Sequence, residues 1–448
     1  MLENQMWMKY GTALEIEWKQ SIEEGKDVED LKEICSQIAG KAENENWEKE
    51  AAEVGSRMLN APVRSDYPYI EPSDLESIRA QAPARRHCFT NSLKQEELKD
   101  KIAGAWIGRI SGCLLGKPVE GFRRKRLYAL LKGTDNYPMH KYICEKEFSE
   151  ELKEQIEYDN LEPWQRCYAD RIGGRAPVDD DTNYTVFALK LVEEYGRDFT
   201  PNDVLEAWLS WIPMFSTCTA ERVAYRNAAA GLYAPKTATV DNPYREWIGA
   251  QIRGDFFGYI NPGDPKAAAA MAWRDASISH VKNGIYGEMF IAAMIAAAAV
   301  CDDRMMVVEA GLDEIPEKCR LRKEIDKVLG WYKDGVDAPE VIERIHQAYD
   351  EYDQHDWCHT NSNAMIVVTA LLYGEGDLGK TICLAVQAAF DTDCNGATAG
   401  SIVGMMAGRS RIPAYWYECY QEKLATSISG YNLVTVEQLT EKTMELLK

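Results

Sequence analysis

Residues 104–116 read GAWIGRISGCLLG and residues 396–408 read GATAGSIVGMMAG, with a glycine at every fourth position of each stretch. A helix with this spacing has one face without side chains, and that face drifts only slowly around the axis. Each glycine costs roughly 1 kcal/mol relative to alanine in a helix interior, so close backbone packing must offset the cost. We therefore expect both stretches, called the glycine ladders below, to lie in the core of a mainly α-helical protein.

Short acidic clusters lie beside the ladders. The second ladder directly follows Asp391-Thr392-Asp393, and Asp179-Asp180-Asp181-Thr182 follows a loop rich in glycine and proline. Clustered carboxylates are hard oxygen ligands, which predicts one or two Mg²⁺ or Mn²⁺ ions. Aspartate also caps helix starts, and that alternative explains one or two acids better than three with a threonine. The candidate metal ligands are Asp179, Asp180, Asp181, Asp391 and Asp393.

Two further places carry candidate functional residues. Glu120 ends the run that follows the first ladder, and only the ladder distinguishes it from an ordinary surface acid. His280 precedes an Asn-Gly turn signal, so His280, Asn283 and Gly284 predict a ligand-binding loop before a helix at 287–300. The alternative is a structural histidine at a helix end.

The pair His355-Asp356 is typical of metal phosphohydrolases of the HD type. That interpretation would recruit His280 and Asp391, and it would leave the three consecutive aspartates unexplained. We therefore rank it below a carboxylate metal site.

Composition excludes several classes of protein. The 448 residues carry 51 basic and 72 acidic side chains, a net charge of −21 that argues against nucleic acid or an anionic membrane as the main partner. The 12 cysteines form no CxxC pair, which favours buried thiols in a reducing cytoplasm over zinc. The N-terminus lacks a signal-peptide pattern, and the longest apolar run, 289–301, is too short to cross a bilayer. We expect a cytoplasmic protein, and the sequence gives no indication of its oligomeric state.

The chain divides into two predicted regions. Residues 1–95 are expected to form an N-terminal helical extension and a proline-rich linker, and residues 96–448 a compact all-helical domain. The helices expected from periodicity span 101–115, 182–195, 202–211, 267–276, 287–300, 321–332, 339–352, 362–373, 378–390 and 396–407.

Three features follow one another along the chain: the small-residue helix that runs into a loop ending in Glu120, the triple-aspartate box and the Asp-Thr-Asp box. In this order they resemble the pattern of the ADP-ribosylglycohydrolase family, which includes the ADP-ribosylarginine hydrolases. The resemblance covers roughly residues 98–412. It implies a metal-dependent hydrolase that cleaves the glycosidic bond of an ADP-ribosyl group on a protein side chain or a small molecule. The alternatives are an ADP-ribose-binding relative with impaired catalysis and a hydrolase of another N- or O-riboside.

The resemblance also implies residue roles. Two Mg²⁺ or Mn²⁺ ions would be bound by Asp180, Asp181, Asp391 and Asp393, with Asp179 supporting. Glu120 or Asp393 would act as the base, and the sequence does not choose between them. His280, Asn283 and Gly284 would hold the diphosphate or the ribose.

This chain departs from the family pattern in two ways. Asp179 stands where the family usually has a metal-binding threonine, and Cys394 stands where it usually has Thr or Ser. A thiol is a poor ligand for Mg²⁺, so Cys394 predicts a metal site that is weaker, hydrated instead, or biased toward Mn²⁺. The long segment between Glu120 and Asp179 is expected to cover the cleft, with Trp164, Tyr168 and Arg171 as possible substrate contacts.

Overall fold

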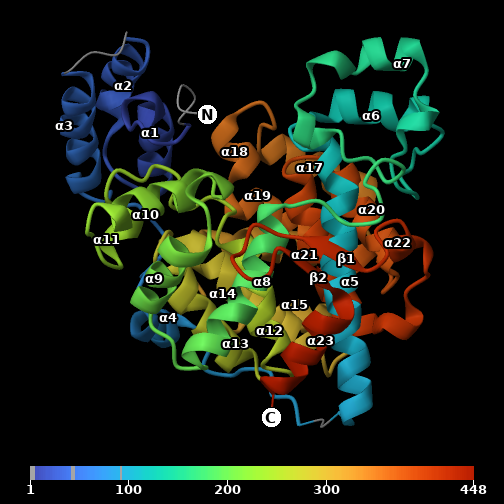
Figure 1. Ribbon diagram of the computed structural model, residues 1–448. Helices are drawn as coiled ribbons and strands as arrows, with labels where there is room; N and C mark the ends of the chain where they lie inside the picture. The colour runs from blue at the N-terminus through green and yellow to red at the C-terminus, as the bar shows by residue number, and fades with distance from the viewer. Residues whose placement is uncertain (1–5, 42–45, 91–92, 448) are drawn as a thin grey trace.

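The two glycine ladders pack directly against each other. In the computed structural model, which describes residues 6–41, 46–90 and 93–447, they lie on the antiparallel helices α5 (Gln95–Gly116) and α21 (Thr392–Ala407) (Figure 1). A Cβ added to Gly108 would lie 2.0 Å from the carbonyl oxygen of Gly400, and one added to Gly112 would lie 1.9 Å from that of Gly396. Only glycine permits this approach, which confirms the predicted position of both ladders in the core.

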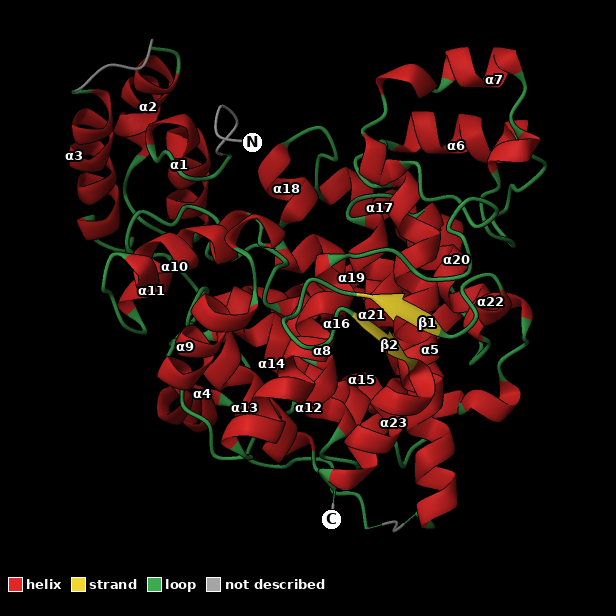
Figure 2. Cartoon of the chain, in the orientation of Figure 1, coloured by secondary structure: helices red, strands yellow, loops and turns green. Residues whose placement is uncertain are grey.

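Helices form nearly all of the regular structure, as Figure 2 shows, so the prediction of a mainly α fold is confirmed. Within the described residues, none of the helices has both the length and the apolar character needed to cross a membrane. The other α-helices are α1 (Leu14–Glu23), α2 (Lys32–Ala39), α3 (Trp47–Asn60), α4 (Leu75–Gln81), α6 (Arg124–Gly133), α7 (Glu150–Gln155), α8 (Asp180–Tyr195), α9 (Pro201–Trp211), α10 (Thr219–Ala229), α11 (Lys236–Thr239), α12 (Asp255–Tyr259), α13 (Pro265–Ala276), α14 (Lys282–Ala298), α15 (Arg304–Leu312), α16 (Arg320–Lys333), α17 (Ala338–Ala348), α18 (Gln354–Cys358), α19 (Thr360–Tyr373), α20 (Leu378–Gln387), α22 (Tyr415–Glu418) and α23 (Val436–Glu445).

The remaining elements are short. Strands β1 (Lys423–Ala425) and β2 (Leu433–Thr435) form an antiparallel pair. The 3-10 helices are η1 (Gly11–Ala13), η2 (Glu29–Leu31), η3 (Lys117–Val119), η4 (Glu145–Glu147), η5 (Tyr158–Asn160), η6 (Pro163–Gln165), η7 (Met214–Ser216), η8 (Gln251–Arg253) and η9 (Arg409–Arg411).

Helix α14 occupies the centre of the main body and is buried from Asn283 to Ala298. Its apolar side chains point in all directions, which is typical of a helix enclosed on every side. It begins at Lys282, so the predicted loop through Asn283 and Gly284 is wrong: these residues form the first helical turn. Helix α17 likewise ends at Ala348, short of the predicted end at residue 352.

The N-terminal helices have a small apolar core of their own, which lies on the opposite side of the molecule from α6 and α7 in Figure 1. Its buried members include Leu14, Trp47 and Met58. Nevertheless, Ala13 and Ile78 belong to the core of the main body. The division of the chain at residue 95 therefore stays a prediction.

Buried ion pairs attach α1 to the main body. The guanidinium of Arg245 donates to both carboxylate oxygens of Glu17 at 2.9 Å and to Glu24 at 2.8 Å. The side chain of Arg245 is only 3% exposed, and that of Glu17 is fully buried. Because either charge alone would be costly to bury, each depends on the other for a compensating partner.

Candidate active site

The glycine ladders bring distant acids to one place. The end of α5 and the start of α21 meet where the Thr392 hydroxyl donates to the Gly116 carbonyl at 2.9 Å. Glu120 follows α5 through η3, and its carboxylate lies with those of Asp391 and Asp393 in a group whose ligand atoms are within 4.8 Å of one another. A second such group joins Asp181, Asp393 and Cys394, and a third joins Cys113, Asp179 and Asp181. Asp393 belongs to the first two groups and Asp181 to the last two, so the possible ion positions are adjacent.

The start of α8 supplies the other acids. Asp179 is the N-cap of this helix, and its side chain accepts from the Asp181 amide at 2.9 Å. The N-cap alternative is therefore correct for Asp179, while Asp180 and Asp181 occupy the first turn. We call Glu120, Asp179, Asp180, Asp181, Asp391 and Asp393 the acidic cluster.

Two basic side chains from α5 and η3 contact the acidic cluster. Arg109, fully buried within the first ladder, donates to the carboxylate of Asp181 at 3.0 Å and to its carbonyl at 2.9 Å. Lys117 donates from Nζ to Asp179 at 2.5 Å. Sequence reasoning did not assign either base a role, because nothing in the sequence pairs it with an acid that lies more than 60 residues away.

The acidic cluster is electrostatically strained without a cation. Burial raises the pKa of Glu120 and of Asp391 well above the usual range of a carboxyl group, and the neighbouring carboxylates raise it further. The same two causes raise the pKa of Asp180 to about 8. Burial and then Asp179 likewise raise the pKa of Asp393. A bound divalent cation favours the ionised carboxylates and so removes this cost.

Unpartnered oxygens support a cation site. Asp181 Oδ2, Asp391 Oδ1 and Asp393 Oδ1 are buried and accept no hydrogen bond. Buried carboxylate oxygens are normally hydrogen-bonded or bound to a metal. The donor set, made of carboxylates close together, therefore fits Mg²⁺ or Mn²⁺.

Helices α18 and α19 support Asp391 from the other side. The Asn363 amide oxygen accepts from the Asp391 backbone at 3.2 Å and from the Asn395 side chain at 2.8 Å. The Cys358 thiol lies 4.0 Å from Asp391 Oδ2. The sequence offered no signal for Asn363 or Cys358, since neither belongs to an acidic or glycine-rich motif.

The predicted substrate loop lies against the N-terminal region. The Asn283 amide donates to Glu71 and Glu246 at 2.8 Å each, and its oxygen accepts from the Leu321 backbone at 2.9 Å. His280 Nδ1 lies 2.8 Å from the Ser279 hydroxyl, whereas Nε2 is buried without a partner. None of the contacts described for these residues or Gly284 joins them to the acidic cluster, and their role in substrate binding stays a prediction.

The segment between Glu120 and Asp179 brings one aromatic ring to the cluster. Trp164 lies over Lys117, with Nζ 5.2 Å from the ring centroid. Tyr168 is buried against Phe148, and Arg171 pairs with Glu145, so both consolidate the segment itself.

A separate group of possible metal ligands, outside the acidic cluster, joins Glu23, His355 and His359. The Trp247 indole donates to His355 Nδ1 at 3.1 Å, and the Asn361 amide donates to His359 Nδ1 at 3.0 Å. Both Nδ1 atoms must therefore be acceptors, which leaves the proton on each Nε2. These Nε2 atoms are buried without a hydrogen-bond partner and lie 3.4 Å from Glu23 Oε2, and we call the three side chains the clamp.

The clamp also bears on the HD-type interpretation. Asp356 pairs with Lys19 at 2.6 Å and accepts from the Asp350 backbone at 3.0 Å. His355 and Asp356 thus fasten the N-terminal region, and the structure gives no support to a phosphohydrolase site.

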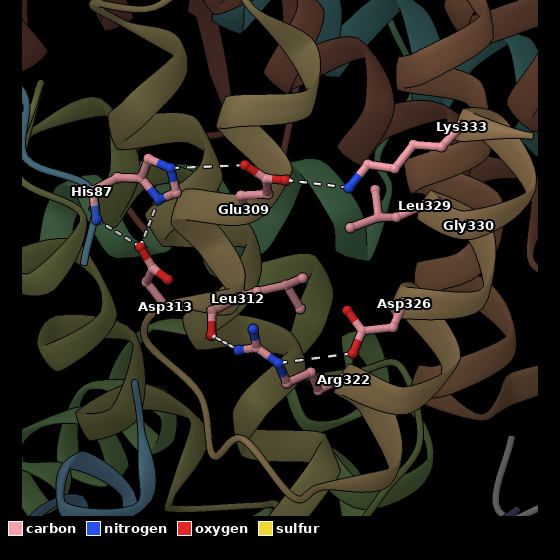
Figure 3. Close-up of a pocket in the computed structure, with 9 residues that line it drawn as sticks. All are labelled: His87, Glu309, Leu312, Asp313, Arg322, Asp326, Leu329, Gly330 and Lys333. Atoms are coloured by element: carbon pink, nitrogen blue, oxygen red, sulfur yellow. Dashed lines mark hydrogen bonds and ion pairs between the residues drawn. The ribbon is translucent and has the colours of Figure 1, made fainter. Parts of the chain in front are cut away.

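A surface hollow of about 340 Å³ lies elsewhere, between α15 and α16 (Figure 3). His87 Nδ1 contacts Asp313 at 2.7 Å, and Glu309 lies between His87 and Lys333 at 3.7 Å from each. These contacts attach the linker to the main body, and the hollow shares no residue with the acidic cluster.

Comparison with known proteins identifies the fold. A sequence profile described as ADP-ribosylglycohydrolase matches residues 94–446. The chain belongs to the ADP-ribosylglycohydrolase family. The protein is therefore an enzyme of the glycosidase class. No curated protein matches the chain in sequence. A solved structure described as "ADP-ribosylglycohydrolase-related protein complex" has 18% identity and a TM-score of 0.46, and the alignment covers 79% of this chain and 98% of that one.

Proposed function

We propose that this ADP-ribosylglycohydrolase uses two divalent ions, Mg²⁺ or Mn²⁺, to hydrolyse the glycosidic bond of an ADP-ribosyl group on a protein side chain or a small molecule. The observation that carries the proposal is the pair of donor groups that share Asp393 and hold unpartnered buried oxygens.

The donor groups suggest how the ions would be held. Asp391 and Asp393, with Glu120 beside them, would bind one ion, and Asp181 and Asp393, with Asp180 beside them, would bind the other. When bound, such ions orient ribose hydroxyls and lower the pKa of a bound water. Cys394 belongs to the second donor group, where its thiol is a poor partner for Mg²⁺, so we expect Mn²⁺ to bind more tightly.

Glu120 and Asp393 are the candidates for the base that takes the water proton. Asp393 is 2% exposed and belongs to both donor groups, whereas Glu120 is half-buried at the end of η3. Water reaches a half-buried carboxylate more readily, so we propose Glu120 as the base and Asp393 as the shared ligand. The remaining carboxylates would stabilise positive charge that develops at the anomeric carbon.

The decisive experiment incubates the pure protein with ADP-ribosylated arginine in Mg²⁺, Mn²⁺ or EDTA and measures free ADP-ribose. We expect metal-dependent release, with Glu120→Gln reducing turnover and leaving Mn²⁺-induced thermal stabilisation measurable. Stabilisation by ADP-ribose without release would favour a binding-only relative. Release from another riboside, and not from ADP-ribosylarginine, would favour the alternative hydrolase.

A further inference from the structure

The acidic cluster contains an ion pair of its own. Lys117 Nζ and Asp179 Oδ2 are 2.5 Å apart, and their side chains are 9% and 1% exposed. The position of Lys117 is fixed by the backbone, because it follows the last glycine of the first ladder and opens η3. The pair therefore joins the end of α5 to the N-cap of α8.

Both oxygens of Asp179 are engaged by nitrogen donors. Oδ1 accepts from the Asp181 amide at 2.9 Å, which is the cap of α8, and Oδ2 accepts from Lys117. In contrast, Asp181, Asp391 and Asp393 each keep one buried oxygen without a partner. Asp179 differs from its neighbours, since its charge is already compensated within the protein.

Lys117 is also close to the groups that would hold the ions. Burial and then the other carboxylates raise the pKa of Asp393 and of Glu120, and the charge of Lys117 opposes this rise. The ring of Trp164 also contacts the ammonium group, with its centroid 5.2 Å from Nζ. An ammonium group held here repels any cation that enters the cluster.

Resting on the proposed metal site, we propose that Lys117 and Asp179 remain paired when ions bind, so that Asp179 is not a ligand. Lys117 is then a positioning residue: it holds Asp179 at the cap of α8 and lowers the affinity of the site for divalent cations. Asp179, in turn, limits this repulsion by neutralising the ammonium charge.

The test measures Mn²⁺ affinity by calorimetry in the unchanged 448-residue chain, in Lys117→Met, in Asp179→Asn and in the double variant. Methionine keeps the length of the lysine stem, and asparagine keeps the cap acceptor. Removing the ammonium should raise Mn²⁺ affinity at least about tenfold, and removing the carboxylate should lower it by a similar factor. The two effects should cancel in the double variant, to within about threefold of the wild type. Lys125→Met, at an exposed position of α6, controls for the loss of a lysine and should leave the affinity unchanged.

Three outcomes would overturn the inference. Unchanged affinity in Lys117→Met means that Lys117 does not oppose the ions. A double variant that binds as weakly as Asp179→Asn means that Asp179 binds the ions directly. Absence of Mn²⁺ binding in the wild type overturns the proposed function, and the inference with it. If a single variant fails to fold, the double variant still tests the inference, because replacing both members of the ion pair leaves no unpaired buried charge.

Discussion

Replacing Gly108 by alanine tests whether backbone contact between the ladders holds the acidic cluster together. The new Cβ would lie 2.0 Å from the carbonyl oxygen of Gly400, whereas real Cβ atoms stay at least 3.0 Å from such atoms. The helices α5 and α21 must therefore separate by about 1 Å or more. The obstacle is backbone, and no flexible side chain can give way.

The cost follows from two opposing terms. Overpacking a close-packed core costs about 1–3 kcal/mol, and we take the upper value because two whole helices must move. Alanine returns about 1 kcal/mol through its higher helix propensity. We expect Gly108→Ala to lose about 2 kcal/mol of unfolding free energy. Mn²⁺-induced stabilisation should also shrink, since the shift moves Asp391 and Asp393 away from Glu120.

Thermal unfolding with and without Mn²⁺ measures both effects. Gly330→Ala is the matched control, because a Cβ at this position of α16 meets nothing within 4 Å. That variant should be stabilised by up to about 1 kcal/mol and should keep its full response to Mn²⁺. A Gly108→Ala protein as stable as the wild type would refute the packing argument.

Three further predictions test the site, the clamp and the response to pH. Asp391→Asn should abolish turnover and Mn²⁺-induced stabilisation. It should not lower the melting temperature of the metal-free protein, because it removes a charge that the neighbouring carboxylates repel, and an active variant would contradict the proposed site. Glu23→Gln should cost about 1–3 kcal/mol in thermal unfolding, because it removes the negative charge that faces Arg320 and both imidazoles. Glu53→Gln, at an exposed position of α3, is the control, and equal melting temperatures would disprove the clamp. Burial, only partly offset by the Ala388 carbonyl, lowers the pKa of His346 to about 4. As the pH falls from about 6.5 towards 4, His346 binds a proton in the unfolded chain and stays neutral in the folded protein, so the unfolding free energy falls. In His346→Gln this loss of unfolding free energy should be smaller by about 1–2 kcal/mol, and parallel pH profiles for the two proteins would refute the argument.

The sequence was most informative where one pattern had a single physical solution. Glycine at every fourth position is costly in an exposed helix, so the ladders implied a helix–helix contact at backbone distance, and the structure has it. The start of α14 was less predictable. Asn283-Gly284 is a turn signal by composition, yet tertiary hydrogen bonds from Asn283 to Glu71 and Glu246 fix it in a helix.

The polar face of α1 shows what periodicity leaves open. Glu17, Gln20 and Glu24 lie opposite the apolar side chains, which by pattern alone suggests a face in contact with water. In the structure all three are buried, because Arg245 and Glu246 of the main body provide their partners. Charge pairs across more than 200 residues have no local signature, and the Lys117–Asp179 pair escaped prediction for the same reason.

These contacts link the N-terminal region to the acidic cluster through one short helix. Lys19 and Glu23 of α1 hold α18 by Asp356 and His355, while Cys358 of the same helix contacts Asp391. Similarity to the family profile begins at residue 94, after the helix that makes these contacts. A fragment defined by the family match alone would leave Arg245 buried without Glu17 and Glu24. Arg320 would keep Glu246 and lose Glu71. The scaffold of this site therefore extends beyond the part of the chain that the family shares.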